Sequence, residues 1–302
     1  QTLPDSLIHV LDKKSAAEKV IYINKLAEKT EKSNPTVSAE LAKIALEIAR
    51  KNGNRKGELT ALISLGKSLK FSGKQAEALK YITDALHIYE TAGIKEGMAY
   101  CFSESGTLNK DLGKSNLAIE NYTKAITMYS EQKDNKNLYL VTSNLATLYF
   151  KIQNYQKAAE TYKKAYEIVE LSNNKQEMMI SLNQIGASYA NWGNYSEALK
   201  FLEQAKQIAE INNYKNYVTS IQKNIDDIKT NIANKDKAIT SYDKEILTQK
   251  DEALNSIKIE NQAVKQANLK TMEEIEKLSF ENQAKELKLH VMQAKFERKT
   301  LE

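Results

Sequence analysis

Apolar residues recur at intervals of three and four along most of the chain, as they do on one buried face of a helix. Between 57 and 71 this face consists of Leu62, Leu65 and Leu69. Between 75 and 90 it consists of Ala78, Ile82, Ala85, Leu86 and Tyr89. Ser72-Gly73-Lys74 separates the two segments, and glycine commonly follows the last residue of a helix. The pattern predicts two antiparallel helices joined by a short turn.

This helical pair recurs every 40 residues. Small residues mark the step in the first helix of each pair: Gly66, Gly106, Ala146 and Gly186. Alanines follow at fixed offsets in the second helix: Ala78, Ala118, Ala158, Ala198 and Ala238, then Ala85, Ala125, Ala165 and Ala205. Small residues are needed where two packed helices come closest. A repeat of this length without strand signals predicts a helical solenoid, with a longer loop after each second helix.

The repeat divides the chain into three parts. Residues 1–18 are expected to form an N-terminal helix or cap, 19–235 the solenoid of about five to six helix pairs, and 236–302 a long helix. The first pair departs from the pattern, because Leu26 stands at the glycine position and Asn34-Pro35 opens its second helix. Terminal repeats commonly differ in this way, since one of their faces has no neighbour. The fold class predicted is all-α.

A heptad pattern extends from Leu247 to Phe296. Its a positions are Leu247, Leu254, Asn261, Asn268, Ile275, Asn282, Leu289 and Phe296, and its d positions are Lys250, Ile257, Val264, Thr271, Leu278, Lys285 and Met292. Asparagine at an a position fixes the register of a parallel dimer and lowers its stability. We therefore expect a weak parallel coiled coil, with a homodimer formed through residues 247–296. The alternative is one solvated helix or a disordered charged tail.

The repeat resembles the tetratricopeptide repeat family. The matching order is a small residue, tyrosine, alanine and alanine, as in Ala146, Tyr149, Ala158, Ala165 and again in Gly186, Tyr189, Ala198, Ala205. Aromatic residues also stand at the position usual for the second helix: Tyr122, Tyr162 and Tyr242. The common period of the family is 34, so longer helices and loops are expected here. The resemblance implies a scaffold whose first helices line a concave groove.

By the same resemblance, fixed positions of each first helix face this groove. They are Lys67, Lys70, Tyr100, Ser103, Thr107, Lys110, Ser143, Asn144, Thr147, Asn183, Gln184, Lys223, Asn224 and Asp227. Amide side chains both donate and accept hydrogen bonds, as pairing with an extended peptide backbone requires. Asn144, Gln184 and Asn224 repeat at 40, as a ladder along a peptide would. The alternative is that these polar residues only solvate an exposed face. The Lys-and-Asn carboxylate clamp of chaperone-binding relatives is not reproduced.

Composition argues against several other functions. The formal net charge of +5 is spread over the repeats, since residues from 233 onward hold 13 Lys+Arg and 13 Asp+Glu. Nucleic-acid binding is therefore not expected. A single cysteine, Cys101, excludes an internal disulfide and is interpreted as a small buried apolar residue. The three histidines lie in different regions, and no catalytic or phosphate-binding motif occurs. We expect a non-catalytic protein without metal or cofactor.

The arrangement also resembles the N-terminal sensor region of tetratricopeptide-containing two-component sensor histidine kinases of the Bacteroidetes. The residues that carry this resemblance are Leu-Pro-Asp-Ser-Leu-Ile at 3–8, Ser-Asn-Pro at 33–35 and the Lys/Glu/Gln-rich coil. It implies signal transduction through the coil to a kinase outside this chain, with the repeats on the periplasmic side of a membrane. Gln1 would then follow a cleaved signal peptide. The alternative is a cytoplasmic peptide-responsive regulator or assembly scaffold that binds an effector through the coil.

Overall fold

The computed structural model of the protein describes residue 9 and residues 11–238 and 241–300. In these ranges the regular structure is helical throughout. The helices are α2 (Ala16–Thr30), α3 (Pro35–Lys51), α4 (Arg55–Phe71), α5 (Gln75–Ala92), α6 (Lys95–Asp111), α7 (Ser115–Glu131), α8 (Asn135–Lys151), α9 (Tyr155–Ser172), α10 (Lys175–Trp192), α11 (Tyr195–Ile211), α12 (Lys215–Ala238) and α13 (Ser241–Thr300). The chain forms two compact units, residues 1–230 and 231–302. The predicted all-α solenoid with a C-terminal helix is confirmed.

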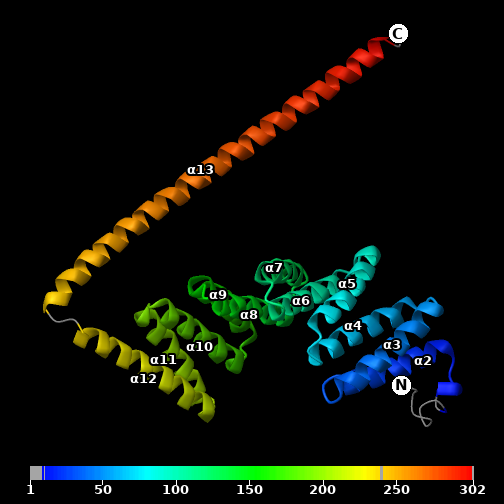
Figure 1. Ribbon diagram of the computed structural model, residues 1–302, viewed down its shortest axis with the longest axis horizontal. Helices are drawn as coiled ribbons and strands as arrows, with labels where there is room; N and C mark the ends of the chain where they lie inside the picture. Colours follow the sequence, from blue (N-terminus) through cyan, green and yellow to red (C-terminus); the bar gives the residue numbers. More distant parts are fainter. Residues whose placement is uncertain (1–8, 10, 239–240, 301–302) are drawn as a thin grey trace. The chain divides into compact units, whose positions relative to one another are not determined.

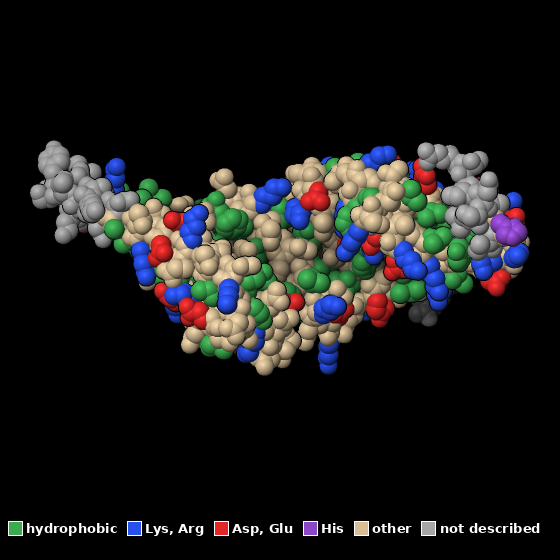
Figure 2. Space-filling view, turned by 90° about the horizontal axis from the view of Figure 1, so that it is seen from below, with side chains coloured by type: hydrophobic (Ala, Val, Ile, Leu, Met, Phe, Trp, Pro, Cys, Tyr) green, Lys and Arg blue, Asp and Glu red, His purple; other side chains and the backbone are tan. Residues whose placement is uncertain are grey.

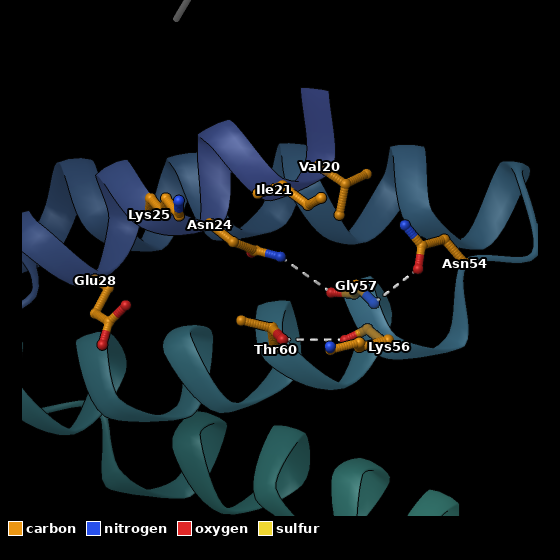
Figure 3. A pocket seen from close by; sticks show the side chains of 9 residues that line it. All are labelled: Val20, Ile21, Asn24, Lys25, Glu28, Asn54, Lys56, Gly57 and Thr60. Carbon is orange, nitrogen blue, oxygen red and sulfur yellow. Dashed lines mark hydrogen bonds between the residues drawn. The ribbon is translucent and has the colours of Figure 1, made fainter. Parts of the chain in front are cut away.

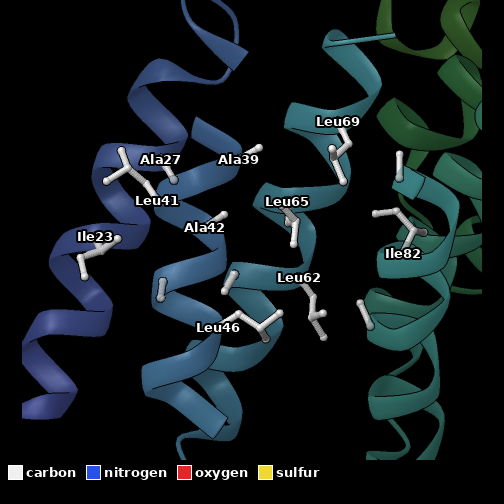
Figure 4. Packing of buried hydrophobic residues seen from close by; sticks show 14 of the residues in the cluster. Ile23, Ala27, Ala39, Leu41, Ala42, Leu46, Leu62, Leu65, Leu69 and Ile82 are labelled. Atoms are coloured by element: carbon white, nitrogen blue, oxygen red, sulfur yellow. The ribbon is translucent and has the colours of Figure 1, made fainter. Parts of the chain in front are cut away.

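Helices α2 to α11 stack as pairs in chain order (Figure 1). In each pair the first helix carries an even number and the second an odd one. The cluster in Figure 4 shows how α2, α3, α4 and α5 bury apolar residues against one another, among them Ile23, Leu46, Leu62 and Ile82. Burying such side chains contributes about 1.5–3 kcal/mol each, so most of the stability of these helices comes from packing.

Every connection in the solenoid has the same short form, and the expectation of longer loops after the second helices is wrong. A residue with positive φ follows each helix at intervals of 20: Gly53, Gly73, Gly93, Gly113, Lys133, Gln153, Asn173, Gly193 and Asn213. The left-handed conformation suits glycine, since other residues crowd their Cβ there. Only helices of 15 to 18 residues separate these turns from α2 to α11, so the long period results from helix length.

Small residues make the close approach of the two helices in a pair possible. A Cβ atom placed on Gly106 would lie 2.5 Å from Tyr122 Cδ1. One placed on Gly186 would lie 2.7 Å from Leu202 Cγ and 3.1 Å from the carbonyl oxygen of Ala198. These separations are shorter than van der Waals contact, so the helices could not pack as they do with larger residues. The interpretation of the small residues as packing positions is confirmed.

The end of the solenoid differs from the predicted sixth pair. A turn was expected before Asp236, with the long helix beginning at 236, but α12 continues to Ala238 and α13 begins at Ser241. The physical reason is that no glycine or proline occurs after Gly193 to end the helix. Ile221, Ile225 and Ile228 are buried, so the first part of α12 closes the solenoid. Residues 239–240 and the side chains of Ala238 and Tyr242 lie outside the described residues.

Helix α13 leaves an apolar stripe uncovered. Five predicted a and d residues are each more than half exposed: Leu254, Ile257, Val264, Ile275 and Leu278. Asn261, Asn268 and Asn282 are exposed on the same stripe. The predicted side chains of Leu247, Leu289, Met292 and Phe296 lie outside the described residues. In the described part of the chain, no helix combines the length and the apolar character that crossing a membrane requires.

Candidate protein-binding groove

The predicted groove residues lie on the first helix of successive pairs, at equivalent positions, because one repeat is 40 residues. We call the surface formed by α2, α4, α6, α8, α10 and the first part of α12 the first-helix face. Most of the predicted side chains there are half-buried, whereas Thr147, Lys223 and Asp227 are exposed. In Figure 2, Lys and Arg side chains alternate with Asp and Glu over the visible surface instead of gathering in one region. The groove is therefore polar rather than strongly charged.

Two predicted lysines are already paired with carboxylates. Lys70 Nζ lies 2.6 Å from Glu104 Oε2, and both side chains are about one-fifth exposed. Lys67 Nζ lies 4.0 Å from Glu31 Oε2 and 5.9 Å from the ring centroid of Tyr100. Their charges are thereby balanced within the protein, and a free carboxylate would have to compete with Glu31 and Glu104 for them.

The two predicted threonines serve the packing of the second helices. The hydroxyl of Tyr122 donates a hydrogen bond to Thr107 Oγ1 at 3.1 Å, and the hydroxyls of Thr147 and Tyr162 lie 2.8 Å apart. Each pair is separated by 15 residues, and no tyrosine stands 15 residues after the other two residues at this position, Lys67 and Ala187. Burial raises the pKa of Tyr122 to about 12. The threonines thus satisfy phenol groups that burial removes from water.

Other predicted residues carry polar atoms without a partner. Tyr100 OH, Ser143 Oγ and Asn183 Oδ1 are buried and accept or donate no hydrogen bond in the described part of the chain. Burial, with a smaller contribution from the carboxylate of Glu104, raises the pKa of Tyr100 above its usual range. An unpaired buried polar group costs about 1–3 kcal/mol, so such groups are uncommon in folded proteins. These three atoms mark the part of the face where a ligand could complete hydrogen bonds.

The predicted amide ladder lies beside these atoms. Asn144 and Gln184 follow Ser143 and Asn183 in sequence and are half-buried, as is Asn224. In the described residues their side chains make none of the recorded hydrogen bonds. Six groups therefore remain available along α6, α8, α10 and α12: three unpaired buried atoms and three amides.

The sequence prediction missed two members of this ladder, although the 40-residue step could have found them. Counting back from Asn144 gives Glu104, which neutralises Lys70, and Asn24 on α2. Asn24 is 5% exposed, and its Nδ2 donates to the carbonyl oxygen of Gly57 at 3.1 Å, while Oδ1 has no partner. It lines a cavity of about 380 Å³ between α2 and α4 (Figure 3). The first-helix face thus offers an unpaired acceptor near its N-terminal end as well.

The described residues offer no chemistry beyond recognition. No group of three or more His, Cys, Asp or Glu side chains in the described ranges could hold a metal ion. Cys101 is fully buried, which confirms its interpretation as a packing residue. Burial raises the pKa of its thiol to about 12.

We expect Cys101 to be nearly inert toward thiol reagents in the folded protein. The thiolate is the reactive species, and at pH 8 a thiol with this raised pKa is almost fully protonated. Reaction with 5,5′-dithiobis(2-nitrobenzoic acid) should be slower than in the unfolded chain by about 100-fold or more. The rate in guanidinium chloride is the control. Equal rates in both conditions would show that α6 opens readily.

Comparison with known proteins agrees with this architecture. Residues 137–211 match the family model described as tetratricopeptide repeat. The search of curated protein sequences gave no match. The TPR-like repeats assigned to a Podosopora anserina kinesin light chain share 16% identity at a TM-score of 0.59, over 67% of this chain and 99% of that chain.

Two further structures have the same fold. A Signal Transduction ATPase with Numerous Domains from Pyrococcus horikoshii, which has a tetratricopeptide repeat sensor, shares 19% identity at a TM-score of 0.63, over 71% of this chain and 35% of that chain. A Rap protein complexed with Competence and Sporulation Factor shares 16% identity at a TM-score of 0.51, over 76% of this chain and 70% of that chain. The comparisons define the class of protein as a tetratricopeptide repeat solenoid.

Proposed function

We propose that this protein binds an extended polypeptide segment along its first-helix face. The observation that carries the proposal is the set of unpaired buried atoms, Tyr100 OH, Ser143 Oγ and Asn183 Oδ1, beside the amide ladder. A peptide backbone offers N–H and C=O groups in regular alternation, which both hydroxyl and amide groups can complete. The Rap structure, complexed with a factor, supports a binding role for solenoids of this fold.

The ligand should be polar or neutral rather than strongly acidic. Lys67 and Lys70 face carboxylates of the protein, so only the hydrogen-bonding groups farther along the face remain unpaired. Affinity would come from several hydrogen bonds of about 0.5–1.5 kcal/mol each rather than from a charge clamp. This distinguishes the proposed ligand from a C-terminal carboxylate held by lysines.

Substitution of the groove should remove binding without loss of stability. We expect peptides selected on the full chain from a phage-displayed library to bind Asn144→Ala, Asn183→Ala and Asn224→Ala about tenfold more weakly each, as loss of one hydrogen bond predicts. Each melting temperature should stay unchanged, since the change in unfolding free energy is about 0.5 kcal/mol or less. For Asn183→Ala it should even rise slightly, because an unpaired buried oxygen is removed.

Fluorescence polarisation and circular dichroism give the two readouts. Thr83→Ala, on the exposed surface of α5, is the matched control and should leave peptide affinity unchanged. If the library yields no binding peptide, or if the groove variants bind as tightly as the wild-type chain, the proposed site is wrong.

We further propose that α13 joins two copies of the chain in a parallel coiled coil. Its apolar stripe is exposed in the single chain, with Leu254 54% and Ile275 60% exposed. A second copy supplies an identical stripe in register, and asparagines at a positions can pair across the axis. Such a dimer would carry two grooves on one coil.

The place of this protein in a cell is part of the same proposal. The sequence resemblance supports the sensory part of a two-component histidine kinase on the periplasmic side of a membrane, with a kinase module in another part of the protein. The cytoplasmic regulator or scaffold is supported equally well by the fold. The sequence that follows residue 302 in the gene is the deciding observation. About 20 consecutive apolar residues there would support the membrane sensor, and their absence would overturn it.

A further inference from the structure

A second cavity lies away from the first-helix face, between two second helices. It has a volume of about 520 Å³ and lies between α7 and α9, with α8 forming its floor. Its apolar lining includes Ile126 of α7, Leu145 and Tyr149 of α8, and Ile168 and Leu171 of α9. Leu171 is 81% exposed at its edge. The cavity shares no residue with the predicted groove, so peptide binding there does not explain it.

The corresponding space one repeat later is filled by an aromatic side chain of the protein itself. Phe201 of α11 stacks on Tyr189 of α10, with ring centroids 5.7 Å apart and an interplanar angle of 3°. Lys163 of α9 lies over both rings, 5.1 Å from the Phe201 centroid, and its Nζ donates to Tyr189 OH at 2.6 Å. An aromatic stack with a cation over it fills that space.

The 40-residue step identifies what the open cavity lacks. Counting back from Lys163, Tyr189 and Phe201 gives Thr123, Tyr149 and Thr161, and all three line the cavity. Tyr149 remains as the stacking surface, whereas Thr161 replaces the phenylalanine. A threonine side chain is much smaller than a benzyl group and leaves the ring position empty. The cavity is therefore a space that the fold elsewhere fills with one phenyl ring.

We propose that this cavity receives an aromatic side chain of a partner protein, stacked on Tyr149 as Phe201 stacks on Tyr189. The apolar walls favour an uncharged ring, since a buried charge would lack a partner there. Lys164 and Glu167 on α9 have opposite charges and line the same cavity, so they do not favour an anionic or a cationic neighbour to the ring. The site lies on the second helices, so a partner could occupy it while a peptide lies on the first-helix face.

The test uses the full chain with isotope-labelled isoleucine methyl groups and N-acetyl-phenylalanine amide as the probe. We expect saturable NMR shifts of the Ile126 and Ile168 methyl groups on addition of this probe. N-acetyl-leucine amide should bind about tenfold more weakly, because it cannot stack on Tyr149. Equal shifts with both probes, or none with the phenylalanine probe, would overturn the proposal.

Two substitutions exchange the residues of the two repeats. Thr161→Phe should close the cavity, abolish the shifts and leave the melting temperature equal or higher, whereas the matched control Thr161→Ser should bind as before. Phe201→Thr should open the equivalent space, so that the probe now also shifts the methyl group of Ile208, the residue 40 positions after Ile168. Retained binding in folded Thr161→Phe contradicts the proposed position of the ring.

One further outcome separates a partner from a second copy of this chain. If sedimentation shows that Thr161→Phe lowers the oligomeric state of the chain without added probe, the cavity is filled by another copy, and the proposed partner is wrong. If the oligomeric state is unchanged while probe binding is lost, the proposal is supported.

Discussion

Replacing Asn261, Asn268 and Asn282 with isoleucine is expected to tighten self-association of the full chain by about 100-fold or more. All three asparagines are exposed in the single chain on the stripe that contains Leu254 and Ile275. In a coiled coil they would leave water, and an isoleucine would bury apolar surface there instead of an amide. Even about 1 kcal/mol for each substitution gives this factor in the dissociation constant. The choice among oligomers should loosen, because the register-fixing amides are lost.

Sedimentation equilibrium of the wild-type and triply substituted chains measures this change. The matched control is Asn255→Ile, since residue 255 stands at a b position, one residue after the a position Leu254, and faces away from the predicted interface. This control should associate as the wild-type chain does. If the wild-type and triple-variant chains both remain monomeric at high concentration, α13 is not a self-association helix. The scaffold hypothesis, with an effector covering the stripe, would then be preferred.

Ala158→Leu is expected to destabilise the solenoid by about 1–3 kcal/mol, because a fully buried alanine is replaced where the first and second helices touch. In the equivalent position of the next pair, the backbone oxygen of Ala198 lies within 3.1 Å of a Cβ added to Gly186. A leucine could be accommodated only by moving α9 away from α8. The melting temperature should fall by about 3–10 °C.

Thermal unfolding followed by circular dichroism is the measurement. Gln156→Leu adds the same side chain at an exposed position of α9 and is the matched control. Its unfolding free energy should change by no more than about 0.5 kcal/mol. Equal losses in the two variants would show that the small residues are not the packing contacts of the repeat.

The predicted groove is only partly a binding surface in the structure. Thr107 and Thr147 hydrogen-bond to buried tyrosines, and Lys67 and Lys70 face carboxylates. The remaining positions on α6, α8 and α10 hold the unpaired groups. A position in a repeat can therefore serve packing in one unit and recognition in the next, depending on what stands 15 or 34 residues away.

The sequence by itself determined the architecture. A 40-residue step in Gly66, Gly106, Ala146 and Gly186 predicts paired helices, since only small residues allow their backbones to approach. The turns were less predictable, because Lys133, Gln153, Asn173 and Asn213 adopt positive φ without being glycine. Packing of the helices on either side holds these residues in a conformation that local preference disfavours.

Only the tertiary structure decided which polar groups are free and which spaces are open. Glu104 lies 34 residues after Lys70, yet the two side chains meet across neighbouring first helices. Thr161 differs from Phe201 by one substitution in the repeat, and the difference becomes a cavity only when α7, α8 and α9 are packed together. Periodicity along the chain records which residues are equivalent. Pairing and cavity volume depend on contacts between different repeats, which no local pattern specifies.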